Sequence, residues 1–365
     1  MPDSVNDHPL RPYDAVLVQS FGGPEGPDEV LPFLRRVTAG RGVPDERLVE
    51  VGAHYERVGG VSPLPALNRR LVADLTAELT ARECPLPVAL GNRNSTPFVP
   101  EALDELEAGG ARHVLVVPTS AWRSYSSCRQ YREGLAEAVE GRPGLVVDKV
   151  RPFGEHPGFA ATLARDTLAG ARAAVEAVGA DAVALLYVTH SIPDAMDETS
   201  GPGDGDGRAY SADQAELAAA ITAEDRVDLP AGLAFCSRSG SPRTPWLEPD
   251  VNDRIRELAD EGVRHVVVVP IGFVSDHMEV VHDLDVEAAA TAAEVGLGMT
   301  RVPTPGADGD FVRGLVDLML ERAAQARGEE PVRAVWRDLD SHPAVCPVGC
   351  CPNLREALPA SCGSD

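Results

Sequence analysis

The fold is decided by two similar stretches of sequence, Gly110-Ala-Arg-His-Val-Leu-Val-Val-Pro118 and Gly262-Val-Arg-His-Val-Val-Val-Val-Pro270. Each contains a short, continuous apolar run, which is typical of a parallel strand covered on both faces. A second similar pair begins at Asp14 (Asp-Ala-Val-Leu-Val-Gln-Ser) and at Asp181 (Asp-Ala-Val-Ala-Leu-Leu-Tyr-Val-Thr-His-Ser). The members of each pair are a domain's length apart, which is too far for a solenoid repeat. We therefore expect two similar lobes, with convergence between Val-rich strands as the alternative.

Further apolar runs alternate with segments of helical length and periodicity. The expected strands are Ala15–Val18, Val88–Leu90, His113–Val117, Leu145–Val150, Ala182–Val188, Gly232–Phe235 and His265–Val269. Helices are expected at Leu67–Arg82 and Val251–Glu261 and around Phe311–Arg327. This alternation predicts the α/β class, with two Rossmann-like parallel sheets and a cleft lined by the carboxyl ends of their strands. The expected domains are residues 12–160 (first lobe), 161–306 (second lobe), 307–328 (a C-terminal helix that packs back on the body) and 329–365 (a cysteine-containing tail).

The charge of the chain excludes two classes of partner. The 365 residues include 57 acidic and 33 basic side chains, for a net charge of −24. Nucleic acids and anionic lipid surfaces both need clustered basic side chains, so neither is an expected partner. No apolar segment approaches the ~20 residues that span a bilayer, and the N-terminus lacks the apolar core of a signal peptide. We therefore expect a cytoplasmic protein, whose seven cysteines are thiols or metal ligands rather than disulfides.

Two polar segments follow predicted strands of the second half, at the edge where α/β enzymes place catalytic groups. His190 ends one strand, and a neutral imidazole can accept a proton or bind Fe²⁺, although a histidine there can also be satisfied by the backbone. After the other strand, Glu279, Asp283 and Glu287 are spaced to lie on one face of a helix, with Asp276 one turn before. Such a row can deliver a divalent cation or relay protons. In so acidic a chain, a solvated helix face is the alternative.

Five motifs, in order, resemble the ferrochelatase family from about Tyr13 to Arg327. They are Ser20-Phe-Gly-Gly-Pro24, His54-Tyr-Glu-Arg-Val-Gly-Gly-Val-Ser-Pro63, Thr189-His-Ser-Ile-Pro193, Ser237-Arg-Ser-Gly240 with Pro245-Trp-Leu-Glu-Pro249, and Pro270-Ile-Gly-Phe-Val-Ser-Asp-His-Met-Glu279. Each motif alone is weak, and their combination in order is specific. The resemblance implies a lyase with two chelatase-type lobes that inserts its substrate metal, Fe²⁺, into a porphyrin.

Metal insertion requires a base for the pyrrole N–H protons, weak N/O ligands for Fe²⁺, and an apolar cleft with polar anchors. The resemblance implies that His190 and Glu279 are the catalytic, iron-binding pair. It also implies that Tyr55, Ser62 and Tyr131 contact the porphyrin and its propionates.

At two places the chain departs from the family pattern. Phe21 stands where some relatives have a Tyr that caps the metal, so that contact should be absent because Phe cannot bind a metal. Gly91-Asn-Arg-Asn-Ser-Thr-Pro97 stands where many relatives have a Tyr-Trp-His sequence. The departure puts in doubt any aromatic or histidine role there.

The tail contains the sequence Cys346-Pro-Val-Gly-Cys350-Cys351, which is poorly suited to a disulfide within itself and fits thiolate coordination of a metal better. Some ferrochelatases bind a [2Fe–2S] cluster with three tail cysteines and one internal cysteine. The resemblance therefore implies the ligand set Cys128, Cys346, Cys350 and Cys351. A structural Zn²⁺ site is the competing interpretation, and Cys362 is an alternative tail ligand. Cys84 and Cys236 are expected to be small buried residues.

The compact form, without an apolar C-terminal extension, resembles the Gram-positive branch of the family, whose substrate is coproporphyrin III. We expect coproporphyrin III and Fe²⁺ as substrates, Fe-coproporphyrin III as a product in haem b biosynthesis, and transient contacts with neighbouring haem-pathway enzymes. Four propionates need basic anchors, for which the candidates are Arg41, Arg57, Arg123 and Arg129. The alternatives are a protoporphyrin IX ferrochelatase, a cobalt or nickel chelatase for another tetrapyrrole, and a non-catalytic haem carrier or iron–sulfur sensor on the same scaffold.

Overall fold

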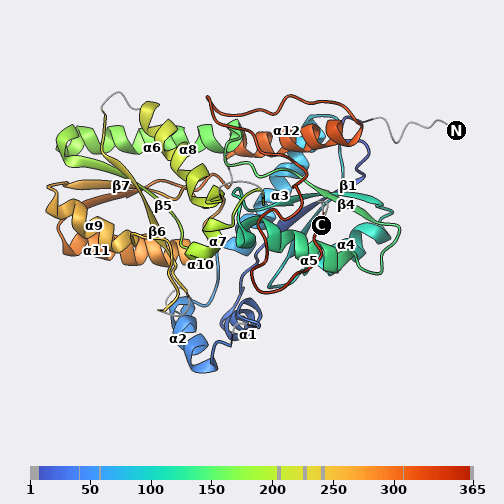
Figure 1. Ribbon diagram of the computed structural model, residues 1–365, viewed down its shortest axis with the longest axis horizontal. Coiled ribbons are helices and arrows are strands. Elements are labelled where there is room, and N and C mark those ends of the chain that lie inside the picture. Colours follow the sequence, from blue (N-terminus) through green and yellow to red (C-terminus); the bar gives the residue numbers. More distant parts are fainter. Residues whose placement is uncertain are drawn as a thin grey trace.

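The computed structural model describes residues 8–40, 42–56, 59–203, 207–224, 228–239, 243–306 and 308–361. Within them, two parallel four-stranded sheets lie side by side (Figure 1). The first has the order β2-β1-β3-β4, in which β1 is Ala15–Ser20, β2 Val88–Asn92, β3 His113–Pro118 and β4 Val146–Lys149. The second has the order β6-β5-β7-β8, in which β5 is Val183–His190, β6 Ala231–Cys236, β7 His265–Val269 and β8 Gly298–Arg301. The two sheets repeat one topology, which confirms the predicted pair of Rossmann-like lobes.

All seven predicted strands are present, and no end differs from its prediction by more than two residues. The eighth strand, β8, was not predicted. Its four residues, Gly-Met-Thr-Arg, are all half-buried, so the sequence there contains no apolar run. It is recognisable only through its pairing with β7, in which His265 lies opposite Gly298.

Helices cover both faces of both sheets. The helices of the first half are α1 (Pro27–Val37) and α2 (Asp45–Glu56), which pack against each other away from the sheets (Figure 1), and α3 (Leu64–Ala81), α4 (Val99–Ala108), the π-helix η1 (Tyr125–Arg129) and α5 (Gln130–Val139). In the second half they are α6 (Pro157–Val178), the 3₁₀-helix η2 (Ala180–Ala182), α7 (Asp194–Glu198), α8 (Ala209–Glu224), α9 (Val251–Asp260), α10 (Met278–Val280), the π-helix η3 (Val281–Ala288), α11 (Ala289–Glu294) and α12 (Gly309–Ala326).

Side chains of each strand point alternately to opposite faces, which explains why the strands read as unbroken apolar runs. In β1, Val16 and Val18 belong to a core cluster shared with α3, α6 and α12, whereas Ala15 and Leu17 belong to a second cluster under α4 and α5. The first cluster continues into the second lobe through β5, β7 and α8. One continuous core therefore joins the two lobes.

The C-terminal helix α12 packs against α6 and α3 (Figure 1). The approach of α6 and α12 is close enough to require glycine, because a Cβ on Gly158 would lie 2.7 Å from the Cα of Gly314. Helix α6 runs across the predicted domain boundary between residues 160 and 161. No helix in the described part of the chain is both long enough and apolar enough to cross a membrane.

Candidate active site

His190 and Glu279 meet where two neighbouring strands of the second sheet end. His190 is the last residue of β5, and Glu279 lies in α10, shortly after β7. His190 Nε2 is 3.5 Å from Glu279 Oε2, while its Nδ1 is 2.5 Å from the carbonyl oxygen of Ser191. Burial alone would lower the pKa of His190, but the Glu279 carboxylate, together with the Ser191 carbonyl and Asp283, holds that pKa above its ordinary value. The pair therefore combines a basic imidazole with a half-exposed carboxylate.

Buried hydrogen bonds fix the end of β5. The hydroxyl of Tyr210, on α8, donates to the carbonyl oxygen of His190 at 2.9 Å and lies 2.8 Å from Thr189 Oγ1. On the other side, a Cβ on Gly272 would lie 2.0 Å from Thr189 Oγ1, so only glycine allows the chain after β7 to pass this close. The backbone that carries His190 is thus held from both neighbouring elements.

The acidic row lies on a helix, as predicted: it begins at Glu279 in α10 and continues through Asp283 and Glu287 on the π-helix η3. In a π-helix the i→i+5 hydrogen bonds make each turn wider than in an α-helix. Residues four apart nevertheless share a face. Ser237, which has a left-handed φ of 60°, donates a hydrogen bond to the Asp283 carboxylate, and burial raises the pKa of Asp283. His282 Nδ1 lies 3.3 Å from Asp283 Oδ1 and 3.8 Å from Glu287 Oε1.

Asp276 does not join this row. Its carboxylate pairs with Arg301 at 3.0 Å and accepts a hydrogen bond from Thr304 at 3.2 Å. The row that remains beyond the His190–Glu279 pair is Asp283 and Glu287.

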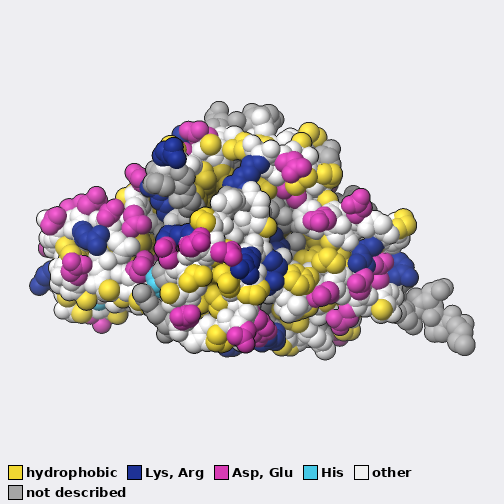
Figure 2. Space-filling model, turned by 90° about the horizontal axis from the view of Figure 1, so that it is seen from below, with side chains coloured by type: hydrophobic (Ala, Val, Ile, Leu, Met, Phe, Trp, Pro, Cys, Tyr) yellow, Lys and Arg dark blue, Asp and Glu magenta, His cyan; other side chains and the backbone are white. Residues whose placement is uncertain are grey.

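An aromatic wall extends from Glu279 into the first lobe. Tyr55, on α2, is buried, and both burial and the Glu279 carboxylate raise the pKa of its hydroxyl. The ring centroid of Tyr55 is 6.3 Å from that of Phe33, which is 6.0 Å from that of Phe21. Met278, beside Glu279, belongs to the same apolar cluster. Apolar side chains gather in the middle of the face on which α1 and α2 lie, with charged side chains around them (Figure 2).

Arg93, which the sequence analysis did not single out, lies at the far end of this wall. It follows β2, and its guanidinium carbon lies 4.8 Å from the ring centroid of Tyr131 and 6.0 Å from that of Phe21. Burial raises the pKa of Tyr131, and Arg93 opposes that rise. Arg93 forms no ion pair with any carboxylate in the described residues. The available signal was a basic residue directly after a strand that ends at the cleft edge.

The other predicted contacts are more enclosed. Tyr131, on α5, is 5% exposed, and Ser62 is 3% exposed, with its amide donating to Pro24 O at 2.8 Å. Among the predicted propionate anchors, Arg123 pairs with Asp213 at 2.6 Å and Arg129 with Glu133 at 3.1 Å, so internal carboxylates already hold both. Arg41 and Arg57 lie outside the described residues.

The ferrochelatase family model matches residues 13–323, which is most of the chain. The chain belongs to the ferrochelatase family. It is 48% identical to the coproporphyrin III ferrochelatase of Streptomyces griseus over 365 residues, covering 97% of each chain. It is 40% identical to that of Corynebacterium glutamicum over 376 residues, covering 98% of this chain and 100% of the relative. Among solved structures, SirB from Bacillus subtilis with Fe³⁺ is similar over 86% of this chain and 97% of its own, at 13% identity and a TM-score of 0.49.

The tail of this ferrochelatase extends beyond the family match and brings the four predicted cysteines together. Cys128, in η1, and Cys346, Cys350 and Cys351 form one buried cluster. Cys350 Sγ lies 3.8 Å from Cys351 Sγ, and the amide of Gly201 donates to Cys351 Sγ at 3.1 Å. Both hydrogen bonds, that from Cys350 first, lower the pKa of the Cys351 thiol. Cys84 and Cys236 are buried elsewhere, and Cys362 lies outside the described residues.

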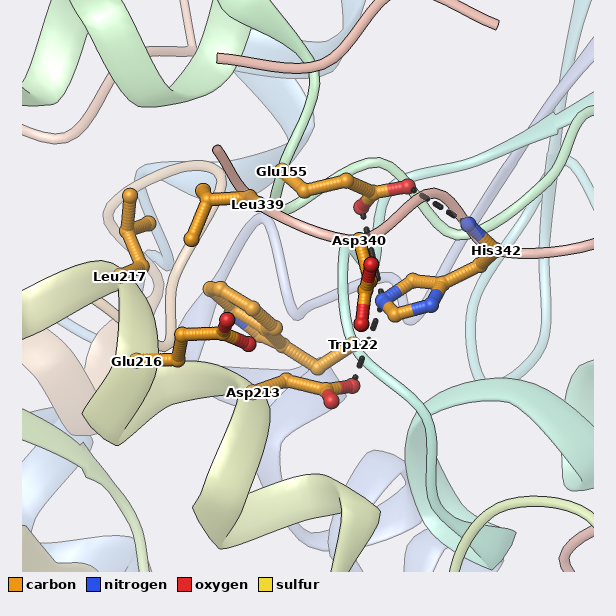
Figure 3. Close-up of a pocket in the computed structure, with 8 residues that line it drawn as sticks. All are labelled: Trp122, Glu155, Asp213, Glu216, Leu217, Leu339, Asp340 and His342. Carbon is orange, nitrogen blue, oxygen red and sulfur yellow. Dashed lines mark hydrogen bonds and ion pairs between the residues drawn. The ribbon is translucent and has the colours of Figure 1, made fainter. Parts of the chain in front are cut away.

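A buried histidine anchors the tail between the lobes (Figure 3). His342 Nε2 is 3.3 Å from Asp213 Oδ2, on α8, and 3.6 Å from Glu155 Oε2, which precedes α6. The backbone amide of His342 also donates to Glu155 Oε1 at 3.2 Å. These three side chains line a cavity together with Trp122 and Leu339. One tail side chain thus bridges two carboxylates that belong to different lobes.

Proposed function

We propose that this ferrochelatase inserts Fe²⁺ into coproporphyrin III and yields Fe-coproporphyrin III for haem b biosynthesis. The observation that carries the proposal is the His190–Glu279 pair, which meets the apolar wall of the first lobe at Tyr55. The relatives that match 97–98% of this chain at 40–48% identity are coproporphyrin III ferrochelatases, which supports this choice of porphyrin.

In this mechanism the porphyrin lies against Tyr55, Phe33 and Phe21, with its centre facing His190 and Glu279. The pair binds the entering Fe²⁺ and accepts the two pyrrole protons that leave as the Fe–N bonds form. Asp283 and Glu287 then pass those protons toward solvent. Phe21 can pack against the ring but offers no ligand to the metal.

Arg93 supplies the positive charge that the substrate's propionates need. Arg93 lies at the opposite end of the aromatic wall from Glu279. A porphyrin whose centre faces His190 and Glu279 carries its propionates at the ring edge, so an anchor is needed at that distant end. Tyr131, directly beneath Arg93, and Ser62 complete this predicted porphyrin contact. A charge-assisted hydrogen bond from Arg93 to a propionate holds the substrate, although the protein as a whole is acidic.

The choice of substrate is tested by comparing kcat/KM for coproporphyrin III and protoporphyrin IX under anaerobic conditions. We expect a clear preference for coproporphyrin III, and an equal or reversed preference would contradict it. The carrier and sensor alternatives predict that His190→Ala and Glu279→Ala leave any iron insertion unchanged. We expect both variants to bind porphyrin and to lose metal insertion.

We also propose that Cys128, Cys346, Cys350 and Cys351 hold a [2Fe–2S] cluster, for which four buried thiols are the required donor set. Among the described residues, only His282, Asp283 and Glu287 have metal-binding atoms that all lie within 4.8 Å of one another. In any set of three of these cysteines, at least two sulfur atoms are therefore more than 4.8 Å apart. A single tetrahedral Zn²⁺ would instead hold its sulfur ligands ~3.8 Å from one another. This spread favours ligands shared between two irons.

A bound cluster would supply one-electron redox chemistry and a cross-link between the tail and the first lobe. Iron and acid-labile sulfide analysis after anaerobic purification tests the assignment. We expect two irons and two sulfides per chain; stoichiometric zinc without sulfide would establish the competing Zn²⁺ site. The cytoplasmic location, the four domain bounds and transient contacts with haem-pathway enzymes stay predictions from the sequence.

A further inference from the structure

The tail meets the second lobe at the loop between α7 and α8. The amide of Gly201, in that loop, donates to Cys351 Sγ at 3.1 Å, and the amide of Cys351 donates back to Gly201 O at 2.9 Å. Gly201 has a left-handed φ of 93°, and a Cβ there would lie 2.8 Å from that of Ala209. Two opposed hydrogen bonds at a position that requires glycine therefore fix the tail to this loop.

The residue before Gly201 continues the contact to α8. Ser200 Oγ accepts a hydrogen bond from the amide of Tyr210 at 2.9 Å and donates one to Asp197 O at 2.7 Å. The Asp197 carboxylate accepts from the amide and the hydroxyl of Ser211, at 3.1 and 2.7 Å. Ser200, Asp197 and Tyr210 are each at most 3% exposed. Because these bonds are buried and short, a displacement at Gly201 is passed on to Tyr210.

Tyr210 in turn reaches the backbone of His190. Its hydroxyl has one proton, which it donates to His190 O at 2.9 Å, so the Thr189 hydroxyl 2.8 Å away must donate to Tyr210. Burial raises the pKa of Tyr210, which keeps that proton in place at neutral pH. Hydrogen bonds and one peptide unit therefore join Cys351 to His190 without a break.

A separate part of the tail holds the same region of α8. Asp213, one turn after Tyr210, lies 3.3 Å from His342 Nε2 and 2.6 Å from the Arg123 guanidinium. In chain order, Tyr210 thus stands between two residues that the tail contacts, Gly201 and Asp213. The place of Tyr210 depends on how the whole tail is seated.

We propose that Tyr210 is a positioning residue for His190 and that the tail, through Cys351 and the α7–α8 loop, holds Tyr210 in place. The inference rests on the iron-insertion site proposed above, where His190 Nε2 lies 3.5 Å from Glu279 Oε2. A misplacement of about 1 Å in such a site can cost roughly 10²-fold in rate. Tyr210 is buried and bonds to the backbone of His190, so it positions that residue without contacting the substrates.

The first comparison removes one buried hydroxyl from each of two tyrosines. Tyr210→Phe deletes the bond to His190 O, and Tyr187→Phe is its control. Tyr187 lies on β5, three residues before His190, is fully buried, and has its hydroxyl 3.1 Å from Thr222 Oγ1. Both variants lose a buried hydrogen bond beside the same strand, but only one loses the bond to His190.

The second comparison disturbs the loop. Gly201→Ala introduces the Cβ that Ala209 leaves no room for. Its control is Gly179→Ala, where φ is a similar 86° but the added Cβ meets nothing within 4 Å. Each full-length variant, and the double variant Tyr210→Phe with Gly201→Ala, is assayed anaerobically for kcat and KM with Fe²⁺ and coproporphyrin III. Amide hydrogen exchange of the peptide that contains His190 is followed by mass spectrometry.

We expect Tyr210→Phe to lower kcat about tenfold, to leave the KM for coproporphyrin III unchanged and to speed amide exchange around His190. Gly201→Ala should act in the same direction, and both controls should match wild type. The double variant should be no slower than Tyr210→Phe alone, because both changes act through the same link.

A wild-type kcat in Tyr210→Phe, or an equal loss in Tyr187→Phe, would overturn the positioning role. Losses that multiply in the double variant would overturn the link to the tail. If Gly201→Ala does not fold, His342→Ala, which frees the tail from Asp213, replaces it in the same comparison. Wild-type rates in His190→Ala would instead refute the iron-insertion site itself, which separates that failure from this one.

Discussion

Replacing Arg93 by methionine removes the positive charge at the far end of the aromatic wall while keeping a side chain of similar length. Arg93 has no carboxylate partner in the described part of the chain, so its charge is available to a propionate. A hydrogen bond to a charged group contributes about 1.5–3 kcal/mol. The expected result is therefore a Kd for coproporphyrin III that is about 10- to 150-fold weaker. Loss of the contact with the Tyr131 ring should cost roughly 0.5–1 kcal/mol of folding stability.

The assay is fluorescence quenching of metal-free coproporphyrin III and of its tetramethyl ester, which lacks the carboxylates. Arg93→Met should weaken binding of the acid and leave binding of the ester unchanged. Arg93→Lys should retain part of the affinity. The control Arg112→Met, at an exposed arginine that directly precedes β3, should retain all of it. Equal losses for the acid and the ester, or no loss for either, would refute the role of Arg93 as a propionate anchor.

Three further changes test other parts of the structure. His342→Ala removes the partner that two buried carboxylates share, while Asp213 keeps Arg123 and Glu155 keeps Arg151, so we expect a loss of about 1–3 kcal/mol in chemical denaturation, together with faster proteolysis of the tail; a loss below about 1 kcal/mol would show that the tail is held elsewhere. Glu279→Gln removes the charge that raises the pKa of His190, so the imidazole should titrate at lower pH in NMR spectra; an unchanged or higher midpoint would contradict the ion pair. Gly158→Ala should destabilise the protein by about 1–3 kcal/mol by forcing α6 and α12 apart, whereas Gly134→Ala, where a Cβ meets nothing within 4 Å, should not; equal effects would contradict the close approach.

The sheets were predictable because burial on both faces leaves continuous apolar runs in the sequence, and the duplicated order followed from the two similar stretches. Strand β8 lacks that burial and therefore that signal. The sequence periodicity of Glu279, Asp283 and Glu287 placed them on one helical face. It could not distinguish an α-helix from the π-helix η3, because residues four apart are neighbours in both.

The candidate site was predictable where the motif itself contains the chemistry, as for His190 and Glu279. It was not predictable where a partner is distant in the chain. From the sequence, Arg123 was a candidate anchor for a propionate. In the fold it pairs with Asp213, which lies ninety residues later in the chain.

The most direct test of the central claim is anaerobic incubation of the purified protein with Fe²⁺ and coproporphyrin III, followed by absorbance. Wild type should form the ferrous porphyrin at a rate proportional to enzyme concentration. His190→Ala should bind the porphyrin but metallate it roughly 10²-fold or more slowly. Tight porphyrin binding by wild type without metallation, or wild-type rates in His190→Ala, would contradict the account.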